Sequence, residues 1–191
     1  MKKLGLKISW LIIFLFMALV SCVELIPDPV DPRLPIYSES GKKQSGALID
    51  NIPFVAYPNP FFWGNGSFGS ILNKGDTILT FDFGLIEKNN PNVSKSIFFS
   101  LEKLTPEDWE EMKKNFGKKF RLDNHDTKGR LSSYANDQLI ESIAQSGQIT
   151  VKYIEDLKVL AGTFGFTAQD SSGKKYEVRY GRFDYFIYRL D

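Results

Sequence analysis

Two alternating apolar stretches near the C-terminus, residues 159–168 and 174–180, constrain the fold of this chain more than any other feature. In the first stretch every second residue from Leu160 to Ala168 is apolar or Gly, and mostly small or polar residues lie between them. This period of two is typical of a β-strand with one face in a core. Because the turn-forming residues 169–173 join the two stretches, we expect a pair of adjacent strands.

The apolar pattern changes phase at Gly181. The set before it is Tyr176, Val178 and Tyr180, and the set after it is Phe183, Tyr185 and Ile187. Successive side chains of a strand point to opposite faces, so a shift by one residue requires an irregularity in the strand. A Gly at this position predicts a β-bulge or a sharp bend.

Shorter stretches upstream also have the features of strands. They are a hairpin over 47–56 and strands at 67–72, 78–83, 97–101 and 149–153. In one of them we expect Leu79, Phe81 and Phe83 to point inward. Closely spaced strands with turns between them predict an all-β fold, either an antiparallel β-sandwich or a barrel. A chain of 191 residues with 42% hydrophobic content can bury one sizeable core, so we predict a single domain at 46–191.

One short α-helix is predicted as an insertion in this domain, at 106–116. Thr105 is a suitable N-cap, Pro106 fits the first helical position, and Gly117 suits the end. The apolar stripe of this helix consists of Trp109, Met112 and Phe116. We expect the stripe to pack on the sheet or to close its open end. The segment 136–147 fits a helix by its Leu and Ile residues and a strand with a loop by its flanks, so it stays unassigned.

The N-terminal residues predict export and a lipid anchor. Residues 1–21 combine three lysines with an apolar run over 8–20, which is typical of a signal peptide and short for a bilayer span of about 20 residues. The end of this run, from Leu19 to Cys22, resembles the bacterial lipobox. In that class the Cys becomes the first residue and is acylated, and two acyl chains already give stable anchoring. We therefore predict lipid attachment at Cys22.

The next segment, 22–45, is predicted to be a tether. Its four prolines and the polar run after them favour an extended, semi-rigid chain. Removal of 1–21, with its three lysines and no acidic residue, lowers the formal charge from +1 to −2. That charge, without a cluster of Lys and Arg elsewhere, argues against a nucleic-acid partner.

Several motifs support a family resemblance. Residues 146–151, 162–168 and 181–183 read Ser-Gly-Gln-Ile-Thr-Val, Gly-Thr-Phe-Gly-Phe-Thr-Ala and Gly-Arg-Phe. Together with Gly173, they resemble the closing signature of cell-envelope lipoproteins common in Bacteroidota, a family described as a domain of unknown function. Residues 49–56 resemble the opening hairpin of that family. The resemblance implies an all-β lipoprotein and no catalytic residues, and the helix departs from the family's simplest pattern.

The single His of the chain, His125, lies in the polar run 123–127. A His beside carboxylates can ligate a metal or act as a general base. The run lacks the spacing of a calcium loop, and the chain has no second His to complete a zinc site. Asp and Asn also favour turns for local reasons. We therefore expect a turn here and predict no metal ligand, no cofactor and no catalytic residue.

Consecutive aromatic residues provide a candidate binding surface. It consists of Phe61, Phe62, Trp63 and Asn65. Three aromatic side chains in a row cannot all point into one core, so at least one is expected to face solvent or a partner. Exposed aromatic rings beside polar groups suit sugars or peptides. The alternative is that these rings cap the open end of the β domain.

The sequence therefore predicts a non-enzymatic, lipid-anchored protein of the cell envelope, at the outer membrane. Its partners would be the membrane, through the N-terminal lipid, and a glycan or another envelope protein. One alternative is a small β-barrel carrier of an apolar ligand, which the high Phe and Tyr content suggests. A second alternative is a hydrolase centred on His125.

Overall fold

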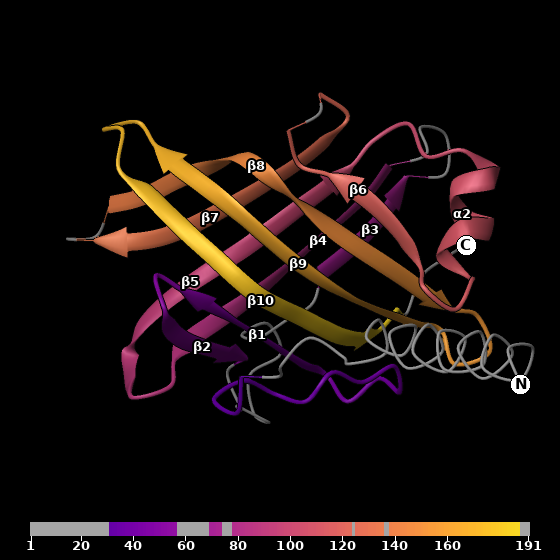
Figure 1. Cartoon of the computed structure of the whole chain (residues 1–191), viewed down its shortest axis with the longest axis horizontal. Helices are drawn as coiled ribbons and strands as arrows, with labels where there is room; N and C mark the ends of the chain where they lie inside the picture. Colours follow the sequence, from indigo (N-terminus) through magenta and orange to yellow (C-terminus); the bar gives the residue numbers. More distant parts are fainter. Residues whose placement is uncertain (1–30, 57–68, 74–77, 124, 136–137, 188–191) are drawn as a thin grey trace, which may run out of the picture. The chain divides into compact units, whose positions relative to one another are not determined.

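Antiparallel strands close into a barrel, with one short α-helix at an end of it (Figure 1). The computed structural model describes residues 31–56, 69–73, 78–123, 125–135 and 138–187. The strands are β1 (Gln44–Ile49), β2 (Ile52–Ala56), β3 (Gly69–Asn73), β4 (Ile78–Glu87), β5 (Asn90–Leu101), β6 (Lys118–Arg121), β7 (Thr127–Ala135), β8 (Gln138–Ile154), β9 (Val159–Asp170) and β10 (Lys175–Phe186). The helix is α2 (Pro106–Met112), and no helix among the described residues is long and apolar enough to cross a membrane.

Eight strands form the closed ring. Their order is β2, β1, β10, β9, β8, β7, β5 and β4, and β2 also pairs with β4 through Phe54 to Ala56. The other two strands lie outside this path: β3 pairs with the first half of β4, and β6 pairs with the second half of β8. Of the two predicted architectures, the structure is therefore the barrel.

Six phenylalanine rings fill the interior of the barrel. They belong to Phe81, Phe83, Phe99, Phe164, Phe166 and Phe183, and none is more than 4% exposed. Their ring centroids lie 5.2–6.4 Å apart. Contacts such as Phe81 with Phe183 join strands that are not neighbours in the ring, so the rings pack opposite walls of the barrel against each other.

Two of these rings cover glycines on the adjacent strand. Gly162 is paired with Phe183, and Phe164 is paired with Gly181. A Cβ atom at Gly181 would lie 2.2 Å from the Phe164 ring, and one at Gly162 would lie 2.6 Å from the Phe183 ring. Each Gly therefore makes room for the ring opposite, which packs directly on the glycine backbone.

The predicted alternations and the predicted bulge are confirmed, with one side chain on the wrong face. Leu79, Phe81 and Phe83 are fully buried, and Thr163 is exposed. The register of β10 shifts between Val178 and Gly181. Tyr180, which we expected to share the inner face, has a φ of 52° and is 43% exposed, because the extra residue of the bulge turns it outward.

The structure also decides two other segments of the sequence analysis, the predicted hairpin at 47–56 and the unassigned segment 136–147. The predicted hairpin at 47–56 is confirmed as β1 and β2, and its turn residues Asp50 and Asn51 have φ values of 50° and 65°. Positive φ at both turn residues matches the right-handed twist of the two strands. The unassigned segment 136–147 is strand from Gln138 onward, as the first part of β8, with an irregularity between Ala144 and Ser146.

The helix begins where the sequence predicts and ends four residues earlier. The Thr105 side chain accepts from the backbone N–H of Asp108, whose carboxylate accepts from the Thr105 N–H, and these bonds complete a capping box. Two of the three predicted stripe residues pack as expected: Met112 is fully buried, and Trp109 packs edge-on against Tyr153. The third, Phe116, is 93% exposed. Phe116 lies beyond the helix end, where the chain turns toward β6.

Residues 31–43, here called the strap, lie against the outer face of the barrel. Asp184 of β10 is 1% exposed, and its carboxylate accepts from two backbone N–H groups of the strap, at 2.7 and 3.1 Å. Arg182 is 7% exposed and donates from Nη1 to the carbonyl oxygen of Pro35 at 3.0 Å. Buried charges require such partners, so the strap and this part of β10 depend on each other.

A second set of contacts holds the strap to β8. Lys152 forms an ion pair with Glu39, and the Tyr37 hydroxyl donates to the same carboxylate at 3.0 Å. Burial raises the pKa of the Tyr37 hydroxyl, which keeps this group protonated as a donor. We expected a spacer over 22–45; its described part instead packs on the barrel, and β1 already begins at Gln44. Residues 22–30 lie outside the described residues.

The Phe-filled interior leads to a first prediction. Phe164→Ala and Phe166→Ala should each lower the free energy of unfolding by about 3–5 kcal/mol, the usual cost of emptying a Phe-sized volume in a core. Thr163→Ala, on the exposed face of the same strand, should change it by about 0.5 kcal/mol or less. Denaturant melts of the three variants measure these values. Equal losses for Thr163→Ala and Phe164→Ala would contradict the assignment of the faces.

Candidate functional site

The predicted lipid-attachment and binding residues lie outside the part of the chain that the structure describes. This holds for Cys22 and for Phe61, Phe62, Trp63 and Asn65. The structure therefore leaves both assignments as predictions.

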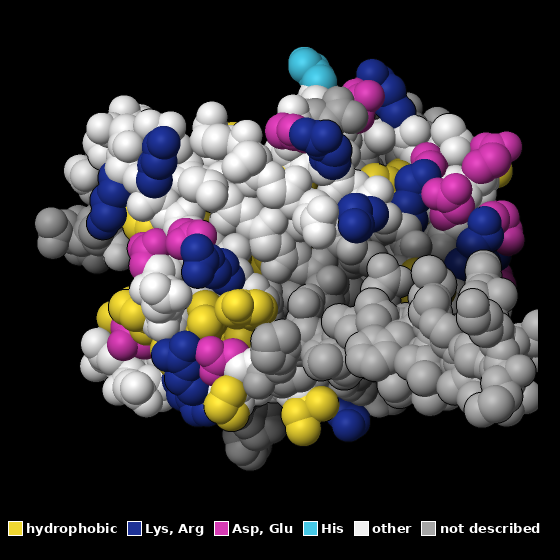
Figure 2. Space-filling model, in the orientation of Figure 1, with side chains coloured by type: hydrophobic (Ala, Val, Ile, Leu, Met, Phe, Trp, Pro, Cys, Tyr) yellow, Lys and Arg dark blue, Asp and Glu magenta, His cyan; other side chains and the backbone are white. Residues whose placement is uncertain are grey.

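His125 lies in an exposed turn between β6 and β7, as expected from the sequence, and its side chain stands on the molecular surface (Figure 2). The acidic residues beside it have basic partners: Asp126 pairs with Lys103 at 2.7 Å, and Asp123 pairs with Arg121. These ion pairs lower the pKa values of both carboxyl groups. Within the described residues, no three His, Cys, Asp or Glu side chains group as metal ligands. The charges of this turn are thus already engaged in local pairs.

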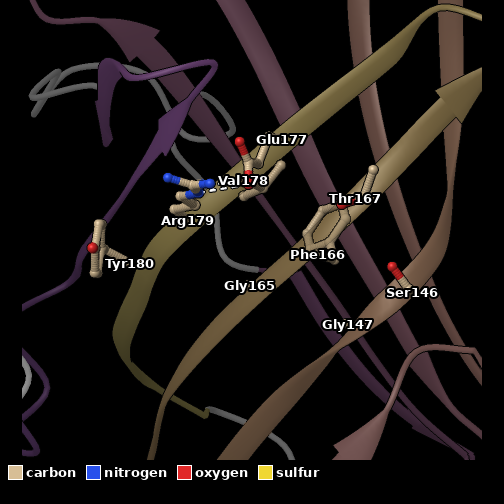
Figure 3. Close-up of a pocket in the computed structure, with 9 residues that line it drawn as sticks. All are labelled: Ser146, Gly147, Gly165, Phe166, Thr167, Glu177, Val178, Arg179 and Tyr180. Carbon is tan, nitrogen blue, oxygen red and sulfur yellow. Dashed lines mark hydrogen bonds and ion pairs between the residues drawn. The ribbon is translucent and has the colours of Figure 1, made fainter.

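A hollow of about 400 Å³ lies on the outer face of β8, β9 and β10 (Figure 3). Glycines form part of its floor: Gly165 in the middle of β9 and Gly147 on β8. The position of Gly165 faces outward, between the two outward threonines of β9, so the missing side chain leaves open space above the sheet. Irregularities in β8 and β10 flank this region.

A side chain would be tolerated differently at the two floor glycines. A Cβ atom at Gly147 would lie 2.4 Å from the carbonyl oxygen of Gly165, and the φ of Gly147 is 132°, a conformation open to Gly alone among common residues. A Cβ atom at Gly165 would meet only the carbonyl oxygen of Val178, at 3.4 Å. Gly147 is therefore needed for close packing of the strands, whereas Gly165 keeps the hollow open.

Polar side chains and one aromatic ring surround the floor. The β10 side contributes Glu177, Arg179 and Tyr180, and the opposite side contributes Ser146 and Thr167 (Figure 3). Arg179 Nε donates to Glu177 Oε1 at 2.6 Å, so the guanidinium is held at the rim with further N–H donors available. Hydroxyl, carboxylate and guanidinium groups around an open floor suit a ligand rich in hydroxyl groups, and a Tyr ring offers a flat apolar face.

Tyr180 also carries backbone strain. Its φ of 52° is uncommon for a bulky side chain and costs on the order of 1–3 kcal/mol. The strain belongs to the bulge of β10, and it directs a large aromatic side chain to the surface at the rim of the hollow. Strained residues of this kind concentrate at functional sites.

The barrel interior is the other place where a ligand could bind. Its middle is filled by the six phenylalanine rings. At the end where β5 begins, Lys95 Nζ lies 5.6 Å from the Phe54 ring centroid and 5.3 Å from that of Tyr176. Burial lowers the pKa of this Lys, and both rings are themselves buried. An interior ligand would therefore have to displace packed side chains.

No residue of the hollow was among the predicted binding residues. The signal in the sequence was Gly165, a glycine at an outward position of an otherwise regular strand, where a side chain would normally cover the sheet. Tyr180 could not have been found in this way, because its alternation with Tyr176 and Val178 indicated the inner face. The phase change at Gly181 predicted the bulge, but the side chain that it turns outward becomes visible only when β10 is paired with β9.

Comparisons with known proteins place the chain in no family. No family model, no curated protein and no solved structure matches it. Its function is therefore inferred from its own residues and geometry.

The two floor glycines lead to a second prediction. Gly147→Ala should lower the free energy of unfolding by at least about 2 kcal/mol, because the new Cβ clashes with backbone and the φ is unsuitable for Ala. Gly165→Ala is the matched control on the next strand and should change it by less than about 1 kcal/mol. Thermal and denaturant melts measure both. A large loss from Gly165→Ala would mean that the hollow is closed by its surroundings.

Proposed function

We propose that this chain is a cell-envelope lipoprotein whose barrel is a non-enzymatic binding module for a saccharide. The observation that carries the binding function is the hollow over Gly165, with two glycines in its floor and a polar and aromatic rim. A barrel fold is compatible with a binding or carrier module. The sequence from Leu19 to Cys22 supports the lipid anchor, and the motifs that resemble those of Bacteroidota envelope lipoproteins support the same cellular location, at the outer membrane.

Sugar recognition follows from the chemistry of the rim. A pyranose ring has an apolar face that packs on an aromatic side chain and equatorial hydroxyl groups that bind charged and hydroxylated side chains. Tyr180 supplies the aromatic surface, and Arg179 with Glu177 supplies donors and acceptors on the same strand.

A second function, transport of an apolar ligand inside the barrel, has the barrel architecture in its favour. The phenylalanine packing argues against it, because ring centroids 5.2–6.4 Å apart leave the rings in direct contact. Extraction of the purified protein followed by mass spectrometry tests this alternative. A stoichiometric lipid in the extract would favour the carrier over the sugar-binding module.

The lipid anchor leads to a third prediction. Cys22→Ser should abolish acylation, because the thiol is the acceptor of the diacylglyceryl group in the lipobox class, and should leave the protein as precursor or in the soluble fraction. Intact-mass spectrometry and membrane fractionation measure the result. Wild-type protein is the control and should carry at least two acyl chains. A membrane-bound, acylated Cys22→Ser product would refute the assignment.

The sugar site leads to a fourth prediction. Gly165→Gln should block the hollow, and Tyr180→Ala should remove its aromatic surface. Either change should weaken binding to a saccharide found on a glycan array by at least about tenfold, which corresponds to 1.4 kcal/mol. Thr163→Gln places the same side chain two residues away on the same outer face of β9 and should bind normally. Normal binding by Gly165→Gln would place the sugar site elsewhere, with the aromatic run 61–63 as the next candidate.

A further inference from the structure

The two ends of the barrel differ in what they expose. The turns that join β1 to β2, β4 to β5, β7 to β8 and β9 to β10 gather at one end, on the left of Figure 1, and this end is here called the hairpin end. Helix α2 lies at the opposite end, on the right. Because β1 and β10 are antiparallel, the end of β1 lies beside the start of β10, and in the same way the end of β7 lies beside the start of β5. The turns that follow or precede these strand ends therefore lie at the same end of the barrel.

The hairpin end exposes large apolar side chains from three separate hairpins. They are Ile52 (44% exposed), Val93 (36%), Tyr134 (70%) and Leu139 (51%). Tyr134 and Leu139 are direct cross-strand partners, so their side chains lie side by side. Single exposed apolar residues are normal on soluble proteins, whereas groups of them mark surfaces that contact a partner or a membrane.

Exposed lysines accompany these apolar side chains. Lys88 lies in the turn between β4 and β5, and Lys174 and Lys175 lie where β10 begins. Figure 2 shows hydrophobic, basic and acidic side chains next to one another on the left of the view. Apolar side chains at loop tips with lysines around them form the pattern of a surface that rests on anionic lipid headgroups.

The strap reaches the barrel at the same end. Arg33 Nη1 donates to the carbonyl oxygen of Asn51, in the turn between β1 and β2, at 3.1 Å. Lys88 Nζ donates to the carbonyl oxygen of Arg33 at 3.0 Å. Cys22 precedes Asp31 by nine residues in the sequence, and a fully extended chain of that length spans at most about 30 Å. A lipid on Cys22 would thus lie within this chain length of Asp31.

Among the described residues, the helix end exposes fewer large apolar side chains than the hairpin end. Helix α2 carries four carboxylates, Glu107, Asp108, Glu110 and Glu111, of which Glu110 pairs with Lys113 and Asp108 and Glu111 pair with Lys118. Two exposed apolar side chains, Phe116 and Leu157, also lie at this end. Leu157 lies between Asp156 and Lys158, and Glu155 pairs with Lys113, so acidic and basic groups are mixed beside it.

We propose that the hairpin end of the barrel docks on the lipid bilayer, with the side chains of Ile52, Val93, Tyr134 and Leu139 in the interface and the lysines at the phosphate groups. Tyr suits this position because it combines an apolar ring with a polar hydroxyl. This docking rests on the proposed lipid anchor at Cys22. It fixes the orientation of the domain, so that the hollow on the side wall of β8 to β10 stays open to the aqueous phase.

The test uses the full chain, acylated in its host membrane and reconstituted in vesicles of phosphatidylethanolamine and phosphatidylglycerol. Acylated Cys22 has no free thiol and is the only Cys in the chain, so Leu139→Cys can carry an environment-sensitive fluorophore alone. Leu157→Cys, 50% exposed at the opposite end, is the matched control. We expect a blue-shifted emission and a several-fold lower iodide quenching constant at position 139, together with quenching by nitroxide-labelled lipid.

Two further measurements separate the possible failures. Intact mass of the reconstituted protein reports acylation: an unmodified Cys22 would overturn the anchor and the docking together, whereas acylated protein with equal iodide quenching at 139 and 157 would overturn the docking alone. A fluorophore at Ile52→Cys should lose its protection when Tyr134 and Leu139 are both replaced by Ser. Because these side chains are exposed, the melting temperature should stay unchanged, and unchanged protection would also overturn the proposal.

Discussion

The packing of phenylalanine rings across the barrel is the interaction on which the rest of this structure depends. Rings from β4 and β5 meet rings from β9 and β10, although these pairs of strands are separated in the ring. An eight-stranded barrel has an interior just wide enough to be filled by side chains. Phe164 and Phe183 occupy that space only because Gly181 and Gly162 lie opposite them. Closure in turn leaves the eight strands without a free edge along most of their length.

Because side chains fill the interior, a ligand has to bind on the outer surface of the barrel. On β10, the residues that alternate with the buried Phe183 and Tyr185 are Arg182 and Asp184, and the strap buries both. The hollow lies beside this region, where Gly165 carries no side chain and Tyr180 is turned outward by the bulge. The inner face of β9 and β10 therefore packs in the core. The outer face of the same two strands holds the strap and forms part of the hollow.

The proposed roles of the chain are compatible because they use different parts of the barrel. The sugar site uses the side wall, membrane docking uses the hairpin end, and the strap links the described domain to the segment that carries Cys22. Because Arg33 is bonded at the turn of β1 and β2, the chain from Asp31 onward is part of the packed domain and is not a free spacer. Docking at the hairpin end would keep the side wall accessible to a soluble ligand.

Local pattern alone determined strands such as β4 and β9 and their inner faces, since Leu79, Phe81 and Phe83 and the residues from Leu160 to Ala168 follow a period of two that has one physical explanation. It also determined the start of α2, because capping at Thr105 is a local interaction. It did not reveal β6, β7 or the first part of β8. Only the tertiary structure decided closure into a barrel, which depends on pairing between β2 and β4, and the direction of Tyr180, which depends on the register of β10 against β9. The same holds for the strap: its prolines indicated an extended chain, but the two buried charges that hold it are about 140 residues away in the sequence, at Arg182 and Asp184.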